Sequence, residues 1–117
     1  MLKSYVLDKR DILGRLGGDE EIFVMMVDMY LQDVDSNCAT LSEALASGDA
    51  MEVQREAHTV KGLLATFSDD AGSEAAFALE QRAKAGDNAG FSEAVADLQA
   101  RLREVAAVLR AATGLPG

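Results

Sequence analysis

Hydrophobic residues recur along most of this chain at spacings of three and four, which is the period of an amphipathic helix. In the longest such stretch they form one continuous stripe of Phe23, Val27, Tyr30, Val34, Cys38, Leu41 and Leu45. A later stretch keeps the same alternation through Phe91, Val95, Leu98, Leu102, Val105 and Leu109. No segment alternates with a period of two for long enough to predict a strand. The pattern therefore predicts an all-α protein.

Glycine and acidic residues mark where the predicted helices begin and end. Asp19 and Asp49 stand where an N-cap is expected, and Gly48 is a stop signal between two helices. Asp87 and Asn88 are expected to open the last helix. The predicted helices cover, in order, about residues 8–16, 19–47, 49–67, 71–86 and 87–113, with a break at residues 68–70 before the fourth.

Four long amphipathic helices joined by short connections predict antiparallel neighbours. We therefore expect an up-down-up-down four-helix bundle over about residues 19–113, with the short helix at about 8–16 capping one end. Met25, Met26 and Met29 are expected to pack against that short helix or to form an exposed apolar patch. The whole chain forms one domain, and a monomer is expected because four helices already close a core.

Composition and charge narrow the function. Of the 117 residues, 49% are hydrophobic and 26% charged, which is a globular balance. With 20 acidic and 11 basic residues, the formal charge of −9 repels phosphate backbones and argues against nucleic-acid binding. No apolar run approaches the roughly 20 residues of a membrane span, so a soluble cytoplasmic protein is expected. The single cysteine, Cys38, excludes an internal disulfide and is expected to be buried.

The only histidine, His58, lies within the third predicted helix. At about 100° per residue, the apolar positions of this helix lie on the side opposite the histidine. The positions within roughly 60° of it are Met51, Gln54, Arg55, Lys61, Gly62 and Ala65. The histidine therefore faces away from the predicted core.

Several chemistries of a lone histidine can be weighed. A metal site in a helical bundle needs Glu-x-x-His pairs, whereas Arg55 occupies the required position and no second histidine exists. A hydrolytic triad needs a carboxylate beside the ring, and Glu56 points away from it. A triad assembled across helices stays open. Alternatively the imidazole is itself the nucleophile, because a largely unprotonated histidine can attack an activated phosphoryl group without a dedicated base.

The neighbours of the histidine favour the last interpretation. Lys61 lies one turn after His58 and Arg55 one turn before it, so two cations flank the ring in an acidic chain. A glycine inside a helix, such as Gly62, destabilises the helix by about 1 kcal/mol relative to alanine. On the exposed face, its missing side chain would let a partner approach the imidazole; close helix packing is the structural alternative.

The segment at residues 57–62, AHTVKG, resembles the His-x-x-Lys-Gly signature of histidine-containing phosphotransfer (Hpt) domains of multistep phosphorelays. Gly48-Asp49 upstream and Leu79-Glu80, Ala83 and Gly86-Asp87 downstream extend the resemblance to roughly residues 20–110. It implies that His58 accepts the phosphoryl group, that Lys61 stabilises that group and that Gly62 gives clearance to the partner. Met51, Gln54, Arg55 and Ala65 are expected to line the docking face.

The resemblance also implies what the chain works with. Such domains are carriers and not autonomous kinases. They exchange the phosphoryl group with the aspartate of a receiver domain or with a histidine kinase, and the Mg²⁺ sits in the receiver. The chain itself is expected to need neither a metal nor a cofactor. Two alternatives stay open, namely a degenerate bundle that binds a receiver without being phosphorylated and a helical adaptor with no relay role.

The sequence departs from the family pattern after the phosphoacceptor turn. Leu63 follows Gly62 where a small residue is usual, residues 67–70 replace a stretch of small residues, and Gly72 replaces a large apolar residue. We expect altered packing between the third and fourth helices or a reshaped partner surface. The chain begins at Met1 without kinase or receiver segments, which fits a free-standing protein or an excised domain. The donor, the acceptor and the direction of transfer lie outside the chain.

Overall fold

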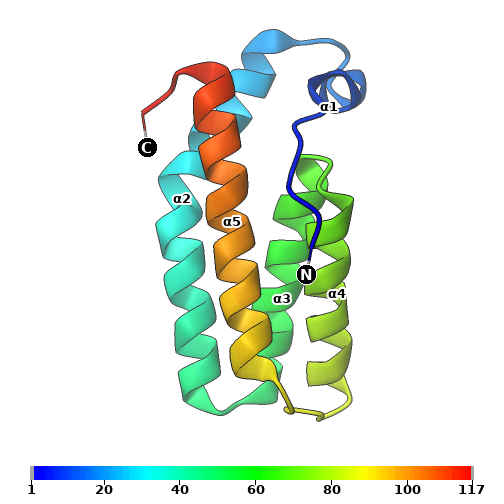
Figure 1. The fold of residues 1–117 in the computed structure, drawn as a ribbon, viewed down its shortest axis with the longest axis vertical. Helices are drawn as coiled ribbons and strands as arrows, with labels where there is room; N and C mark the ends of the chain where they lie inside the picture. The colour runs from blue at the N-terminus through cyan, green and yellow to red at the C-terminus, as the bar shows by residue number, and fades with distance from the viewer. Residues whose placement is uncertain (1, 117) are drawn as a thin grey trace.

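The computed structural model describes residues 2–116, and these contain five helices and no strand (Figure 1). The helices are α1 (Lys9–Arg15), α2 (Glu20–Ser47), α3 (Ala50–Thr66), α4 (Asp70–Lys84) and α5 (Phe91–Thr113). The all-α prediction is confirmed. None of the helices in this part of the chain is long and apolar enough to cross a membrane.

The four long helices run alternately up and down in a bundle, and the whole molecule measures 41 × 24 × 23 Å (Figure 1). Helix α2 contacts α3 and α5, and α4 contacts the same two helices, so each helix has two antiparallel neighbours. Helix α1 lies at the end of the bundle where α2 begins and α3 ends. The predicted up-down-up-down bundle with a short N-terminal helix is therefore confirmed.

Aspartate side chains start most of the helices. The carboxylates of Asp19, Asp49 and Asp69 accept hydrogen bonds from backbone N–H groups in the first turns of α2, α3 and α4. These N–H groups have no partner within their own helix, so each cap stabilises the helix by about 1 kcal/mol. Gly48 ends α2 in the left-handed conformation at φ 70°, which costs glycine no steric strain. The expected N-caps and stop signal are confirmed here.

The last helix begins later than expected. Asp87 does not cap it, because its carboxylate accepts a hydrogen bond from the N–H of Ala89 at 3.2 Å within the connecting turn. Gly90, at φ 74°, turns the chain, and α5 starts at Phe91, which is buried. The prediction that Asp87 and Asn88 open the helix is wrong. The N-cap is Gly90 in the left-handed conformation, and no side chain caps this helix.

The predicted apolar stripes form the core. All members of the α2 and α5 stripes are buried except Leu45, which is half-buried. Alanines on the inner side of α4, Ala76 and Ala83, are buried and let the neighbouring helices approach closely. Cys38 is buried, as expected, and its burial raises the pKa of the thiol. Met25 and Met29 are exposed, so of the two alternatives expected for them the exposed apolar surface fits and packing against the short helix does not.

Arg15 links helix α1 to the end of α3 through hydrogen bonds. Its guanidinium donates hydrogen bonds to the carbonyl oxygens of Thr66 at 2.7 Å and Ala65 at 3.4 Å. It also contacts Ser68 Oγ at 3.1 Å and Asp11 Oδ2 at 2.7 Å. The last carbonyl groups of a helix lack partners within it, and a basic side chain can satisfy them. Helix α1 thus caps α3.

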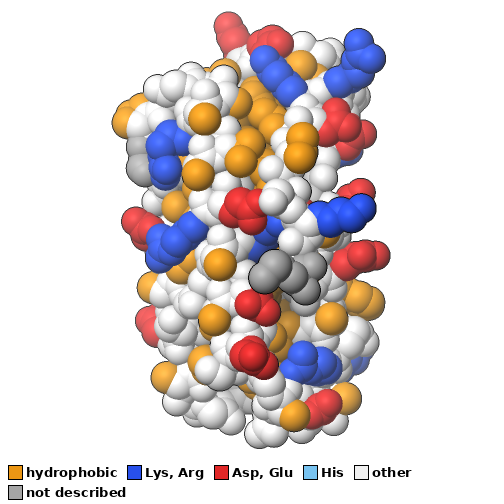
Figure 2. Space-filling model, in the orientation of Figure 1, with side chains coloured by type: hydrophobic (Ala, Val, Ile, Leu, Met, Phe, Trp, Pro, Cys, Tyr) orange, Lys and Arg blue, Asp and Glu red, His pale blue; other side chains and the backbone are white. Residues whose placement is uncertain are grey.

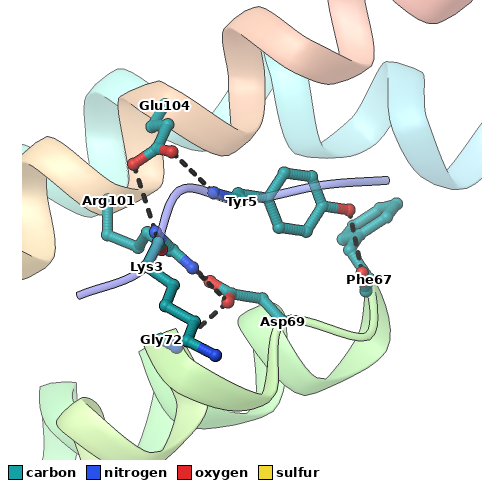
Figure 3. Close-up of polar contacts among 7 residues, drawn as sticks. All are labelled: Lys3, Tyr5, Phe67, Asp69, Gly72, Arg101 and Glu104. Carbon is teal, nitrogen blue, oxygen red and sulfur yellow. Dashed lines mark hydrogen bonds and ion pairs between the residues drawn. The ribbon is translucent and has the colours of Figure 1, made fainter. Parts of the chain in front are cut away.

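A buried ion pair links the turn before α4 to α5 (Figure 3). The guanidinium of Arg101 donates two hydrogen bonds to the carboxylate of Asp69, each 2.7 Å long, and both residues are almost inaccessible at 4% and 3% exposure. Asp69 also accepts the N–H of Gly72 at 3.0 Å. The hydrogen bonds to Asp69 raise the pKa of Arg101 above its ordinary value. Both charges are therefore paired and hydrogen-bonded, as burial requires.

The same cluster holds the N-terminal segment against the bundle (Figure 3). Arg101 donates to the carbonyl oxygen of Lys3 at 2.5 Å, and Glu104 accepts the N–H of Tyr5 at 2.7 Å. The Tyr5 hydroxyl donates to the carbonyl oxygen of Phe67 at 2.8 Å. Burial, with a contribution from the nearby Asp69 charge, raises the pKa of Tyr5 to about 12. Residues 3–5 thus bridge α5 and the α3–α4 turn.

Charges of both signs are spread along the face that carries the N-terminal segment. Figure 2 shows acidic and basic side chains interspersed there, with hydrophobic side chains visible between them toward the end where α1 lies. The excess of acidic residues is therefore not gathered into one patch on this face.

The space around Gly72 predicts a stability difference between two glycines. A Cβ at Gly72 would lie 2.0 Å from Asp69 Oδ2 and 2.9 Å from Leu64 Cδ1, and Asp69 cannot retreat without breaking its bonds to Arg101. We expect Gly72→Ala to lower the free energy of unfolding by about 1–3 kcal/mol, as overpacking does. Gly62→Ala is the matched control, because its Cβ would meet no described heavy atom within 4 Å apart from its chain neighbours and the nearby backbone of its own helix. That variant should gain up to about 1 kcal/mol. Urea unfolding at pH 7 measures both, and a Gly72→Ala protein as stable as wild type would contradict the packing argument.

Candidate functional site

The histidine lies on the outer side of α3. The inner side of this helix buries Val53, Ala57, Val60 and Leu64, which leaves the neighbouring positions toward solvent. The side chain of His58 is 67% exposed. The expectation that the ring faces away from the core agrees with this placement, and a partner molecule can reach it.

The imidazole of His58 is held by a carboxylate from the next helix. Its Nδ1 lies 2.9 Å from Oε2 of Glu80 on α4. An ionised carboxylate can only accept a hydrogen bond, so Nδ1 carries the hydrogen and donates it. In the neutral ring, Nε2 then keeps its lone pair. The contact thus selects the tautomer in which the outer nitrogen is free to react.

The same carboxylate binds the lysine of the motif. The ammonium of Lys61 donates to Glu80 Oε1 at 2.8 Å, so the two oxygens of Glu80 serve Lys61 and His58 separately. The lysine hydrogen bond, followed by that of His58, holds the pKa of Glu80 below its ordinary range, although desolvation opposes them. The Glu80 side chain is only 13% exposed. An ionised carboxylate therefore joins the imidazole and the ammonium at this site.

The other expected docking residues are only partly brought together. Met51, Gln54, Arg55 and Thr59 line a shallow open groove of about 390 Å³ together with His58 and Glu80. The guanidinium of Arg55 bonds to Glu52 at 3.3 Å. Ala65 is exposed on the same helix but does not line this groove.

Gly62 lies on the exposed face one turn beyond the histidine. Apart from its chain neighbours and the nearby backbone of its own helix, a Cβ built at this position meets no described heavy atom within 4 Å. Close packing of helices within the chain therefore does not require a glycine here. The space that the missing side chain leaves open faces solvent.

The sequence interpretation gave Glu80 no role at the site. It placed two cations beside the histidine without naming partners for them, and the structure pairs Lys61 with Glu80 and Arg55 with Glu52. It also found no support for a carboxylate that orients the ring across helices, and the structure supplies one from α4. A signal was present in the sequence. Glu80 directly follows the buried Leu79, so it lies at the border of the interface between α4 and α3.

The departures from the family pattern have separate structural consequences. Gly72 leaves the space that the Asp69 carboxylate fills, which fits the expectation of altered packing between α3 and α4. Leu63 is half-buried and lies beside Met26 and Met29 in an apolar groove between α2 and α3. Within residues 2–116, no three histidine, cysteine or acidic side chains gather closely enough to hold a metal ion.

Known proteins share this fold and sequence pattern. The crystal structure of histidine-containing phosphotransfer protein B (HptB) from Pseudomonas aeruginosa PAO1 is similar, with a TM-score of 0.82 over 94% of this chain and 96% of that chain. The two sequences are 19% identical, so this likeness shows the fold alone. No curated protein matches the chain. The model of the Hpt domain family matches residues 25–110, which is more than half of the sequence. The resemblance first seen at residues 57–62 is thereby confirmed, and the chain belongs to the Hpt domain family.

Proposed function

We propose that this protein is a phosphorelay carrier in which His58 accepts a phosphoryl group from a receiver aspartate or a histidine kinase and passes it to another receiver aspartate. Membership of the Hpt family supports a phosphotransfer role in a phosphorelay. The observation that carries the finer assignment is the bond between His58 Nδ1 and Glu80 on an exposed face. It leaves Nε2 unprotonated and open to a partner.

The transfer step needs no base from this chain. The lone pair of His58 Nε2 attacks the phosphorus of the receiver's aspartyl phosphate. The bond between phosphorus and the aspartate oxygen breaks, and the carboxylate leaves with that electron pair. No proton moves, because Nδ1 keeps its hydrogen and continues to donate it to Glu80. The ring becomes a phosphorylated imidazolium, and transfer to a second receiver runs the same step in reverse.

Charge around the histidine suits both directions of transfer. Before phosphorylation, the charges of Lys61 and Glu80 cancel across a 2.8 Å contact. After it, the carboxylate of Glu80 faces a positive ring, and the ammonium of Lys61 can bond to phosphoryl oxygens. Glu80 thus stabilises the ring of the phosphohistidine and Lys61 stabilises its phosphoryl group. Neither contact is covalent, so transfer stays reversible.

The chain supplies a nucleophile and two countercharges, so in this proposal it is a carrier and not an autonomous kinase. The Mg²⁺ that activates the receiver's aspartate would sit in the receiver. Met51, Gln54 and Arg55 would contact the docked partner beside the histidine. We further propose that the protein acts in the cytoplasm as a monomer, whose four helices already enclose its core.

Replacing the histidine tests the carrier role. Incubation with a phosphorylated receiver should place an acid-labile, alkali-stable label on the wild-type protein. His58→Gln should carry none, because glutamine has no nucleophilic nitrogen. A receiver whose acceptor aspartate is replaced by asparagine is the matched donor control. Label that survives His58→Gln would overturn the assignment, and tight receiver binding without any label would favour an adaptor.

Filling the clearance at Gly62 tests the docking geometry. Gly62→Gln should weaken receiver binding at least about tenfold, because a side chain now stands where the partner approaches. The helix itself should be no less stable, since glutamine is the better helix former. Ala107→Gln adds the same side chain on the exposed face of α5 and should leave binding unchanged. Binding isotherms of the two variants decide, and equal affinities would remove the clearance argument.

The lowered pKa of Glu80 predicts a pH dependence of stability. A carboxyl group with a lowered folded pKa contributes stability above its unfolded value of 4.5, and loses it as the pH falls through the folded value. Glu80→Gln should therefore be less stable than wild type at pH 7, and the difference should shrink toward pH 3. Urea unfolding at both pH values measures it, with Glu74→Gln on the exposed side of α4 as control. A difference that stays constant with pH would show that the charge of Glu80 is not what stabilises the site.

A further inference from the structure

An exposed aromatic residue, Phe77, lies beside the proposed phosphoryl site. Phe77 on α4 is 48% exposed, whereas its neighbours Ala76 and Leu79 are buried in the core. The ring therefore adds little to the interior. It lies three residues before Glu80, which places both side chains on the same side of α4.

The ring of Phe77 faces the ammonium of Lys61. The Nζ atom lies 5.1 Å from the ring centroid, within the range of an attractive cation–π contact. The same atom bonds to Glu80 at 2.8 Å. Helix α4 thus offers the lysine a carboxylate and an aromatic face one turn apart.

This arrangement addresses a specific difficulty of the site. A lysine side chain is long and flexible, so holding its ammonium beside His58 costs conformational entropy. Glu80 can hold it, but a second anion, the phosphoryl group, then competes for the same ammonium. An aromatic face attracts the cation through its quadrupole. This attraction does not occupy any of the ammonium's N–H donors, as a hydrogen bond to a carboxylate does. The N–H groups that Glu80 does not use stay available to phosphoryl oxygens.

We propose that Phe77 is a positioning residue for phosphoryl transfer: it keeps the Lys61 ammonium beside His58 while the lysine's hydrogen bonds shift between Glu80 and the phosphoryl group. The inference rests on the proposed function of His58. In this proposal Phe77 affects the rate of phosphoryl transfer and not the binding of the receiver.

The contact itself can be tested without any phosphorylation. Protons that lie over an aromatic face are shifted upfield by its ring current. The Lys61 methylene protons next to Nζ should show this shift by NMR in the wild type. They should lose it in Phe77→Leu, which keeps an apolar side chain of similar size, and retain it in Phe77→Trp. Identical lysine shifts in wild type and Phe77→Leu would overturn the proposal.

Kinetics then separate positioning from docking. At saturating receiver, the rate constant of phosphoryl transfer should fall about two- to fivefold in Phe77→Leu and recover in Phe77→Trp, with the receiver Kd unchanged. In a Lys61→Ala background, Phe77→Leu should have no further effect, because the cation it positions is gone.

The opposite pattern identifies a different role. If Phe77→Leu raises the Kd with an unchanged rate constant, or still slows transfer in the Lys61→Ala background, the ring contacts the partner and the proposal fails. Failure of the proposed function shows differently, since the wild-type protein would then carry no label on His58 whatever the lysine shifts report.

Discussion

The buried ion pair between Asp69 and Arg101 is the constraint on which the site depends. A buried charge is costly unless it is paired, and removing one partner of such a pair costs about 3–5 kcal/mol. Here the carboxylate also caps α4 through the N–H of Gly72, so a single group fixes the start of α4 and ties it to α5. Arg101 extends the link to the N-terminal segment through the carbonyl oxygen of Lys3. The α3–α4 turn therefore has one position relative to the rest of the bundle.

That position decides what stands opposite the histidine. Because α4 begins at a fixed point and runs antiparallel to α3, its residues pair with α3 in one register. Ser73 bonds to the carbonyl oxygen of Lys61 at 3.2 Å, and two turns later Glu80 reaches His58. The buried Ala76 between them permits a close approach of the two helices. A shift of one residue would turn Glu80 about 100° around its helix and away from the imidazole.

The sequence alone predicts much of this fold, but only part of the site. The spacing of apolar residues and the aspartate caps are local signals, so the helices and the outward face of His58 follow from neighbours within a few residues. The role of Glu80 depends on a contact between residues 22 apart and on the register of two helices, which periodicity does not specify. Residues 68–70 were predicted as a break, yet nothing local shows that Asp69 meets Arg101, 32 residues away. The start of α5 likewise follows the left-handed turn at Gly90 rather than the acidic residues before it.

The two oxygens of Glu80 couple the histidine to the lysine. Because one carboxylate serves both side chains, a change in the charge of either alters the bond to the other. Under the proposed function, phosphorylation adds positive charge to the ring and draws the ammonium of Lys61 toward the phosphoryl oxygens. The hydrogen bond between Lys61 and Glu80 then weakens, while the attraction between Glu80 and the charged ring becomes stronger. The gain on one oxygen offsets the loss on the other. A site balanced in this way favours neither the free nor the phosphorylated histidine strongly, which is the property that a reversible carrier needs.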